Sequence, residues 1–422
     1  MEFGWSEEQR ESLRQARAFA EQELGSGPPG DAGEGPRGGA GGTGEGAGEG
    51  GQVGGGQTEF LRRWLKCADF GVQALVVPSA YGGLGAEALA AVAVLEGLGQ
   101  GSADNGLLLA LGAEMWSVTT PLARLGSEEQ KRRWLPRLAT GESVGAFALT
   151  EPESGSDAFR LRTRARREGS GFRLDGIKTF VTNAPVADLI LVFAATSPEA
   201  GYFGLTAFLL ESTAAGVTVG APLAKMGLES SPMAEIRLDA VWAGPDAVLG
   251  EVGGGAAVAA FTLEWERGLL LAPALGTLER LLRRTTAYCR ARRQFGRPIH
   301  DFEAVGARLA EMRLRLELSR LLVYQFAWRK DQGLASGAEA SMTKLYLSES
   351  LRSACAHALH LHGAAGYCRE LGLEQDWRDA MASSLYSGTT EMNLNLLAET
   401  LLRPEARAAA ESAVRPGNEG GQ

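Results

Sequence analysis

The sequence predicts an α+β protein in which a sheet domain lies between two helical domains. Apolar residues recur at helical spacing between Ser6 and Pro136, short apolar strands follow from Val144 to about Gly250, and long amphipathic stretches begin after Gly253. A chain of 422 residues is long enough for such a composite. The predicted divisions are an N-terminal domain over 1–143, a middle domain over 144–252, a C-terminal domain over 253–408 and a disordered tail over 409–422.

The first helix is predicted over Ser6–Leu24, where Ser6 can cap the N-terminus and Glu7 and Glu8 place negative charge in the first turn. Glycine then makes up 17 of the 33 residues of Gly25–Gln57. This composition buries too little apolar surface to offset the entropy of ordering it, so we expect a flexible surface loop. The helical pattern resumes at about Glu59.

Alternation and turn residues place the strands of the middle domain, and helical periodicity places the helices that follow. The expected strands are Phe172–Leu174, Ile177–Val181 after a hairpin turn at Asp175-Gly176, Leu189–Ala195, Leu205–Leu210, Val217–Val219 and Ala234–Leu238. The expected C-terminal helices are Ala256–Tyr288, Asp301–Gln332, Ala338–Leu361 and Asp379–Leu401.

Composition excludes several classes of function. Acidic residues outnumber basic ones, 51 against 42, which gives no support for nucleic-acid binding. The four cysteines are too scattered for a zinc site or a disulfide framework, which favours a reducing compartment. The N-terminus lacks the pattern of a secretion signal, and no apolar run is long enough to cross a bilayer. We therefore expect a cytoplasmic protein that binds neither nucleic acid nor membrane.

The stretch AFALTEPESGSD, residues 146–157, has the character of a polar cradle. Thr150, Ser154 and Ser156 offer short hydroxyl groups, Gly155 lets the backbone approach a ligand, and consecutive N–H groups can hold an anionic or heteroaromatic molecule. Ser, Gly and Asp also cluster in ordinary turns, so this stretch alone does not decide between the two interpretations.

Further motifs follow in a fixed order: VPSAYGGLG at 77–85, GSEEQKRRWLPRLATGE at 126–142, KTFVTN at 178–183, RRQFG at 292–296, DWRD at 376–379 and YSGTTE at 386–391. Together with the cradle they resemble the acyl-CoA dehydrogenase family of flavoenzymes over nearly the whole chain. The resemblance implies an N-terminal all-α domain, a middle β-barrel or sandwich, a C-terminal four-helix bundle and bound FAD.

The resemblance also implies which residues hold the cofactor. Thr150 and Ser156 would hydrogen-bond the flavin, Phe180 would lie against one face of its ring, and Thr182 would lie near its N5. An aromatic wall excludes water, and hydroxyl donors stabilise the reduced flavin. By itself, Phe180 would be read as an ordinary core residue of a strand.

A second group of residues matches the part of the family that binds the other end of FAD. Arg292 and Phe295 resemble the segment that reaches across a subunit interface to the pyrophosphate, which implies a homotetramer or homodimer. Thr389 and Glu391 match positions on the diphosphate and adenine side. His360 and Gly363 lie where the family also contacts the pyrophosphate, although most members have glutamine at the position of His360.

A metal site is the alternative for the histidines at 357, 360 and 362. On a helix only the first two of them share a face, so a structural role or a role beside FAD is favoured.

The catalytic base is the main departure from the family pattern. Most members carry glutamate in the loop where this chain has Ser387, and serine cannot remove an α-proton unaided. Another branch, which resembles isovaleryl- and long-chain dehydrogenases, carries the glutamate on a helix directly before an arginine. Glu266 precedes Arg267 in this way, whereas Glu264 is about 200° away around the helix. Glu266 is favoured as the base, and a salt bridge to an arginine of a neighbouring helix is its structural alternative.

The resemblance assigns supporting roles to the loop beside the base. Arg267 would order the loop of Tyr386, Ser387 and Gly388, and the backbone N–H of Ser387 would polarise the thioester carbonyl. Glu266 would take the α-proton, and a hydride would leave Cβ for flavin N5. Burial should raise the pKa of Glu266 toward neutrality, where a carboxylate is an effective base.

The expected substrate is an acyl thioester on CoA or on an acyl- or peptidyl-carrier protein. Electron-transfer flavoprotein or another acceptor would reoxidise the flavin. Two alternatives stay open: a relative that passes electrons to oxygen as an oxidase or monooxygenase, and a flavin-binding homologue that has lost catalysis.

Overall fold

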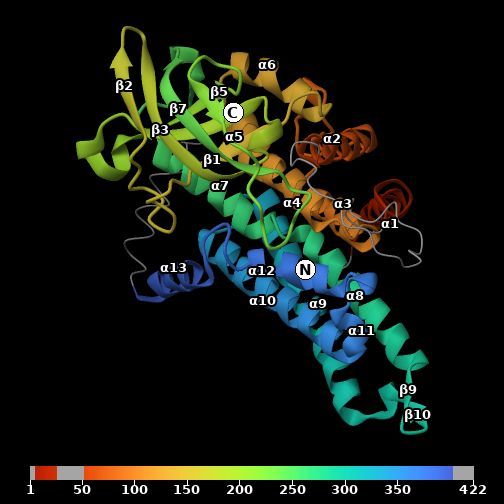
Figure 1. Cartoon of the computed structure of the whole chain (residues 1–422). Coiled ribbons are helices and arrows are strands. Elements are labelled where there is room, and N and C mark those ends of the chain that lie inside the picture. The colour runs from red at the N-terminus through yellow and green to blue at the C-terminus, as the bar shows by residue number, and fades with distance from the viewer. Residues whose placement is uncertain (1–4, 26–51, 403–422) are drawn as a thin grey trace, which may run out of the picture.

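The computed structural model describes residues 5–25 and 52–402, and it contains a β domain between two sets of helices (Figure 1). The first set precedes the sheet and packs against the second set, which follows it. Its helices are α1 (Glu7–Phe19), α2 (Gln52–Phe70), α3 (Ala88–Gly101), α4 (Asn105–Glu114), α5 (Thr120–Leu125) and α6 (Glu128–Ala139), with π-helical turns at Ala20–Leu24 and Met115–Thr119.

The N-terminal helix begins as the sequence predicts. The Ser6 hydroxyl accepts a hydrogen bond from the Gln9 backbone, and the Gln9 side chain accepts one from the Ser6 backbone, which forms a capping box. The prediction of a loop over Gly25–Gln57 is wrong at its end, because α2 already starts at Gln52. The rest of that prediction, over 26–51, lies outside the described residues, as does the predicted tail.

The β domain consists of one sheet with the strand order β6-β7-β3-β2-β4-β5-β8, and β1 pairs with β4 in parallel. Every residue of β4 is buried, because both faces of this strand are covered. Leu191 and Phe193 face the core shared with α5, α6 and α7, while Ile190 and Val192 face the core between β4–β5 and β3–β7. The strands are β1 (Gly145–Ala148), β2 (Arg164–Glu168), β3 (Gly171–Thr182), β4 (Leu189–Ala195), β5 (Leu205–Glu211), β6 (Val217–Val219), β7 (Met233–Ala243) and β8 (Val248–Leu249).

The predicted hairpin turn at Asp175-Gly176 is wrong, because β3 runs straight through it. The chain turns earlier, at Gly169-Ser170 between β2 and β3. The Asp-Gly pair instead marks a shift of register against β7, where the Asp175 carboxylate accepts a hydrogen bond from Ala240 N at 2.9 Å. Glycine is common at β-bulges as well as in tight turns, so an Asp-Gly pair is compatible with either feature. Here it marks an irregularity within a strand and not the predicted turn.

Two predicted C-terminal helices are interrupted. The expected helix Ala256–Tyr288 ends at Leu269 and restarts at Ala272, with Pro273 in the first turn, where proline is tolerated. The expected helix Asp379–Leu401 is divided by the loop 383–389. The observed elements are α7 (Gly255–Leu269), α8 (Ala272–Ala291), the short hairpin β9 (Arg293–Gln294) and β10 (Arg297–Pro298), α9 (Glu303–Asp331), α10 (Gly337–His362), α11 (Ala364–Tyr367), α12 (Leu373–Ala382) and α13 (Thr390–Leu402).

The N-terminal and C-terminal helices share one core, in which α3 packs directly against α8. A Cβ atom on Gly99 would lie 1.9 Å from the Pro273 carbonyl oxygen, and one on Gly276 would lie 2.1 Å from that of Glu96. Both contacts are with backbone atoms, which cannot move aside. Glycine at these two positions therefore allows the two helical domains to pack together.

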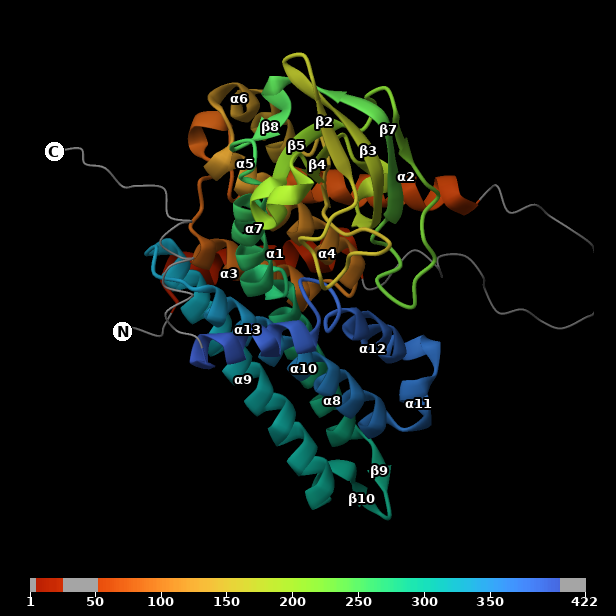
Figure 2. The same ribbon diagram turned by 90° about the vertical axis from the view of Figure 1, so that its left-hand side faces the viewer.

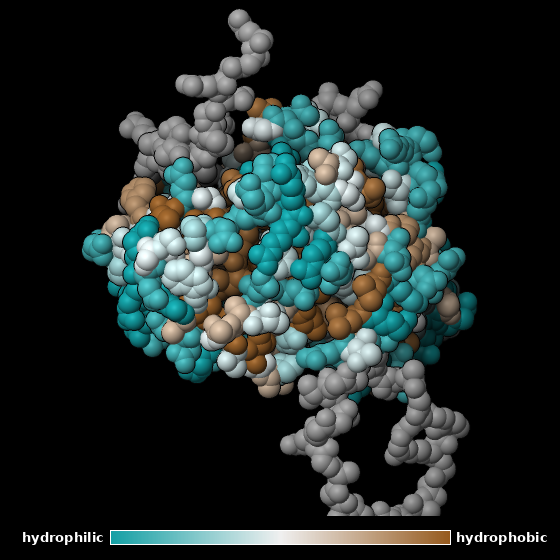
Figure 3. Space-filling model, turned by 90° about the horizontal axis from the view of Figure 1, so that it is seen from above, coloured by the Kyte–Doolittle hydropathy of each residue, from teal (hydrophilic) through white to brown (hydrophobic). Residues whose placement is uncertain are grey.

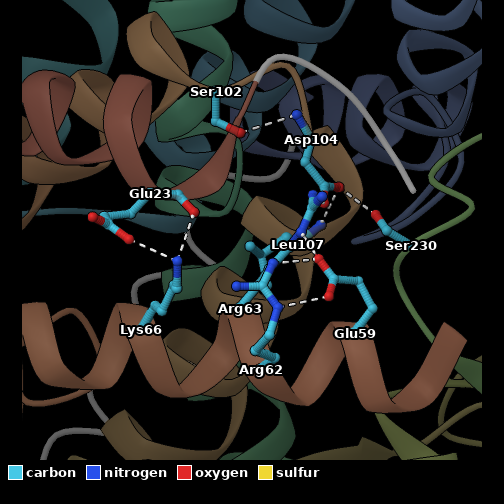
Figure 4. A network of polar contacts seen from close by, with 9 residues as sticks. All are labelled: Glu23, Glu59, Arg62, Arg63, Lys66, Ser102, Asp104, Leu107 and Ser230. Atoms are coloured by element: carbon cyan, nitrogen blue, oxygen red, sulfur yellow. Dashed lines mark hydrogen bonds and ion pairs between the residues drawn. The ribbon is translucent and has the colours of Figure 1, made fainter. Parts of the chain in front are cut away.

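Helix α4 is fixed at its N-terminus by a buried polar network (Figure 4). Asp104 accepts a hydrogen bond from Leu107 N at 3.0 Å, which caps the helix, and it pairs with Arg63 of α2 at 2.9 Å. Ser230, which precedes β7, donates to the same carboxylate. The network thus ties α2, α4 and the β domain together beside the site described below.

The surface of the β domain, seen from above, is mainly polar with scattered apolar patches (Figure 3). Among the described residues, no helix has the length and apolar character needed to cross a membrane.

Candidate active site

Glu266, near the end of α7, carries a buried carboxylate whose two oxygens have different surroundings. Oε1 accepts a hydrogen bond from the Ser387 hydroxyl at 2.9 Å. Oε2 is buried and has no hydrogen-bond partner among the described residues. A buried carboxylate oxygen without a donor is costly, and such groups occur where chemistry uses them.

The competing carboxylate, Glu264, faces another direction. It pairs with Lys330 of α9, whose ammonium group also lies 4.6 Å from the centre of the Trp265 ring. Glu264 is therefore engaged in an ion pair. The predicted alternative for Glu266, a salt bridge to an arginine of a neighbouring helix, is not found among the described residues.

The loop that carries Ser387 is held by cations and amides on both sides. Arg267 Nε donates to the Ser387 carbonyl at 3.1 Å. The Gly388 carbonyl accepts from Lys344 Nζ at 2.7 Å and from Asn393 Nδ2 at 2.8 Å. Ser387 and Gly388 both have positive φ angles, 57° and 86°. Arg267 thus contacts the loop that the resemblance assigns to it, and Lys344 and Asn393 are further contacts that the sequence did not predict.

Burial raises the pKa of Glu266, and the Ser387 hydrogen bond, the Arg267 charge and the nearby Ser117 hydroxyl oppose this rise. Burial, reinforced by the Arg267 charge, lowers the pKa of Lys344 to about 8. A carboxylate with a raised pKa is a stronger base, so the site favours proton transfer to Glu266.

A small cavity of about 40 Å³ begins one helical turn beyond Glu266. Leucine side chains cover much of it, and Tyr386 closes it on the side of the loop. The polar end holds Asp379 and the buried pair Arg280–Asp376, whose atoms lie 2.8 Å apart. The lining residues are Asn105, Leu108, Leu109, Leu228, Leu270, Leu271, Pro273, Ala274, Thr277, Leu351, Asp376, Asp379, Ala380 and Tyr386.

The polar cradle is anchored by a buried ion pair that the sequence analysis missed. Lys178 Nζ lies 2.8 Å from Glu151 Oε1 and 3.0 Å from the Leu149 carbonyl, and Lys178 is 0% exposed. The Glu151 carboxylate also accepts from Thr163 N at 3.0 Å and from Arg162 N at 2.5 Å. Although burial raises the pKa of Glu151, the Lys178 charge and these donors hold it below its ordinary value. The pair fixes the loop to β3.

The residues expected around the flavin fit an aromatic ligand. Phe180 is 64% exposed and has a φ of 55° at a bulge of β3, so its ring turns out of the sheet. Thr179 N donates to the Thr150 carbonyl at 2.9 Å, which places the cradle beside this bulge. The hydroxyls of Thr150, Ser156 and Thr182 make no hydrogen bond within the described residues. A large exposed ring beside free hydroxyl groups suits the isoalloxazine of FAD.

The residues expected at the far end of FAD lie elsewhere. Arg292 directly precedes the β9–β10 hairpin, and Phe295 lies in its turn. The hairpin projects from the end of the C-terminal helices that is remote from the β domain in both ribbon views (Figures 1 and 2). Phe295 is 92% exposed. His360 and Gly363, at the end of α10, are also exposed. One chain therefore does not bring Arg292 and Phe295 to the Phe180 site.

Thr389 and Glu391 flank the N-terminus of α13, next to the Ser387 loop. The Thr389 hydroxyl accepts from Met392 N at 3.3 Å, so it caps this helix, and Glu391 is exposed.

Among the described residues, no cluster of His, Cys, Asp and Glu side chains could hold a metal ion. His357 and His360 both lie near the Arg308 guanidinium, and His362 Nδ1 donates to the Ala358 carbonyl at 2.8 Å.

Three family models match consecutive parts of the chain: the acyl-CoA dehydrogenase N-terminal domain over residues 55–142, the middle domain over 146–241 and the C-terminal domain over 253–402. The chain belongs to the acyl-CoA dehydrogenase family. The fold and family expected from the sequence are thereby confirmed.

Curated and solved relatives give more detail. An L-prolyl-(peptidyl-carrier protein) dehydrogenase of Pseudomonas fluorescens is 38% identical over 341 residues, which cover 81% of this chain and 90% of the relative. The crystal structure of the prolyl acyl carrier protein oxidase AnaB matches with a TM-score of 0.85 and 36% identity, over 94% of this chain and all of that one. PigA with FAD and proline matches with a TM-score of 0.84 and 32% identity, over 95% of this chain and 99% of that one.

As a member of this family, the chain is an FAD-dependent oxidoreductase that dehydrogenates acyl thioesters at a CH–CH bond. The expected class of reaction and the expected cofactor are confirmed.

Proposed function

We propose that this enzyme oxidises a small aminoacyl thioester, prolyl or one of similar size, carried on a peptidyl-carrier protein, with Glu266 as the base. The observation that supports it most strongly is the buried Glu266 carboxylate, with one oxygen held by Ser387 and the other without a donor. Glu264, the alternative base, is paired with Lys330.

In this proposal the chain positions the substrate and moves one proton. The thioester lies with its Cα–H toward Oε2 of Glu266, and the Ser387 backbone N–H faces the thioester carbonyl, which makes the α-proton more acidic. When bound, FAD supplies the acceptor for the hydride that leaves Cβ. Thr150, Ser156, Phe180 and Thr182 hold the ring end of FAD. Burial favours transfer of the proton to Glu266, because it raises the pKa of this carboxyl.

The size of the cavity supports a small acyl group. A water molecule needs about 10–15 Å³ by the same measure, so about 40 Å³ corresponds to roughly three water molecules. A five-membered ring that is partly covered by the flavin is closer in size to this space than a long fatty acyl chain is. The relatives named for prolyl groups on carrier proteins support the same size and the same carrier.

A second copy of the chain completes the proposed FAD site. Arg292 and Phe295 are exposed on a hairpin far from Phe180, which suits a role toward the cofactor of a neighbouring subunit. His360, Gly363, Thr389 and Glu391 would contact the pyrophosphate and adenine parts. The active form is then a homodimer or homotetramer in the cytoplasm.

The test uses the holoenzyme under anaerobic conditions and follows the visible flavin band. We expect L-prolyl carrier protein to bleach the band at least tenfold faster than L-prolyl-CoA or a long-chain acyl-CoA. The variant Glu266→Gln should keep FAD and lose bleaching by at least about 10³-fold, since its amide cannot accept the proton. The matched control Glu264→Gln should bleach at nearly the wild-type rate.

Other outcomes would change the proposal in defined ways. Faster bleaching by a CoA thioester would exclude the carrier-bound substrate, and full activity of Glu266→Gln would exclude Glu266 as the base. Failure of every thioester would favour a homologue without catalysis. Rapid return of the flavin colour in air would identify oxygen as the electron acceptor, as the name oxidase indicates for AnaB.

A further inference from the structure

Ser387 has an unfavourable backbone conformation for a residue with a side chain. Its φ of 57° lies in the left-handed region, which glycine adopts more easily than any other residue. The backbone is fixed there from two sides, because Arg267 Nε binds the Ser387 carbonyl and Lys344 Nζ binds the Gly388 carbonyl. A strained position that keeps its side chain in a site suggests that the side chain has a use.

The Ser387 side chain contacts only one oxygen of the base. Its hydroxyl donates to Glu266 Oε1 at 2.9 Å, and Oε2 is left buried without a donor. Two consequences follow from this contact. The contact restrains rotation of the carboxylate about its last bond, and Oε2 is the oxygen that is left without a hydrogen-bond partner among the described residues.

We propose that the Ser387 hydroxyl is a positioning group that holds the Glu266 carboxylate by Oε1 and leaves Oε2 as the proton acceptor. This inference rests on the proposed function, in which Glu266 is the base. It assigns to the side chain of Ser387 a role separate from that of its backbone N–H. The serine thereby connects the loop to a base that lies on a helix.

The charged and titratable groups around Glu266 agree with this role. Arg267 lies next to it on α7, Lys344 faces it from α10, and Tyr386 faces it from the loop. Arg267 and Lys344 have their own partners in the carbonyls of Ser387 and Gly388, and neither forms a salt bridge with Glu266 among the described residues. The Ser387 hydroxyl donates to this carboxylate at 2.9 Å, and the Ser117 hydroxyl of the turn Met115–Thr119 also lies close to it. Both hydroxyls favour the ionised form and oppose the effect of burial, Ser387 more strongly.

The test compares three holoenzymes, wild type, Ser387→Ala and Ser387→Gly, in single-turnover bleaching across pH. Both variants lose the hydroxyl, but only glycine also relieves the backbone strain. We expect the acidic limb of the rate profile to move up by on the order of one to two pH units in both variants, because the charged carboxylate loses a hydrogen bond. The limiting rate at high pH should fall about tenfold, because the carboxylate is less well oriented.

A second measurement does not depend on turnover. Infrared titration without substrate should show the carbonyl band of protonated Glu266, identified by its absence in Glu266→Gln, persisting to higher pH in both Ser387 variants. Thermal unfolding should find Ser387→Gly more stable than Ser387→Ala, which separates strain from the hydrogen bond.

The outcomes distinguish this inference from the proposed function. An inactive Glu266→Gln together with wild-type pH profiles in both Ser387 variants would overturn the role of the hydroxyl and leave Glu266 as the base. A shift in Ser387→Ala alone would assign the effect to backbone geometry and would also overturn it. Full activity of Glu266→Gln would remove the proposed function itself.

Discussion

Two glutamates of this enzyme, Glu151 and Glu266, hold carboxylate oxygens away from solvent, and these oxygens differ in how many hydrogen-bond donors they meet. The Glu151 carboxylate accepts from the Lys178 ammonium and from the backbone N–H groups of Arg162 and Thr163. The Glu266 carboxylate accepts from the Ser387 hydroxyl, and its second oxygen has no donor among the described residues. The pKa of Glu151 is lowered and that of Glu266 is raised.

The comparison shows how the same side chain serves structure in one place and chemistry in another. A carboxylate surrounded by donors stays ionised and fixes the chain, because losing any partner leaves a buried charge unpaired. A carboxylate with a free oxygen is poorly stabilised as an anion and gains from taking a proton. The number of donors that reach the carboxylate, together with its burial, separates the two roles.

The largest expected effect concerns stability. Glu151→Gln leaves Lys178 charged and buried without its partner, and it should lower the free energy of unfolding by about 3–5 kcal/mol. Glu266→Gln should leave stability unchanged or slightly higher, because an amide is cheaper to bury than a carboxylate and can still accept from Ser387. Urea unfolding of the two variants measures both effects. Equal destabilisation by the two substitutions would contradict the comparison.

A smaller effect, opposite in sign at the two sites, is expected from pH. Glu151 has a lowered pKa, so its contribution to stability is present above the ordinary carboxyl pKa of about 4.3 and is lost as pH falls through the lowered value. Glu266 has a raised pKa, so wild type is relatively more stable at low pH and loses this advantage as pH rises through the raised value.

The measurement is the free energy of unfolding of wild type and of each glutamine variant between about pH 3 and pH 8, a range that spans the ordinary carboxyl pKa. The difference in free energy of unfolding between wild type and Glu151→Gln should become smaller in acid. The free energy of unfolding of Glu266→Gln should rise relative to that of wild type as pH rises. Parallel curves for both pairs would show that neither carboxyl has a shifted pKa.

The smallest expected effect is on the affinity for FAD. Glu151 anchors the polar cradle that is proposed to bind this cofactor. Phe180→Ala removes an exposed ring, so it should raise the Kd for FAD by roughly threefold to tenfold without changing the stability of the apoprotein. Phe203→Ala is the matched control, because Phe203 is also an exposed aromatic residue of the β domain but lies outside the proposed site. Fluorescence titration with FAD would refute the assignment if the control weakened binding as much.

The sequence predicts the parts of this fold that depend on local pattern. Strand β4 matches the predicted bounds Leu189–Ala195, and Ser6 caps its helix as expected. The family resemblance singled out Glu266 by its place before Arg267, and its role as the base stays a prediction. The break before Pro273 was not predicted, although proline favours the first turn of a new helix and so offers a local signal for it.

The remaining features depend on contacts between distant residues. From the sequence alone, Lys178 and Glu151 would be placed on the surface, because charged side chains are rarely buried unless they are paired. The sequence does not show that these two residues pair with each other. The Ser387 hydroxyl reaches a residue 121 positions away, so no local pattern announces it. The serine in the loop instead suggested a loss of function at that position.

The glycine crossing of α3 and α8 has a consequence for how this enzyme can diversify. A single methyl group at Gly99 or Gly276 would collide with backbone, so these positions are closed to variation. The leucines that line the cavity, such as Leu108 and Leu109 of α4, border open space, so an exchange for a larger or smaller apolar side chain changes the size of the cavity. Substitutions in the cavity lining can therefore change the range of substrates, while the packing of the helices beside the base stays the same.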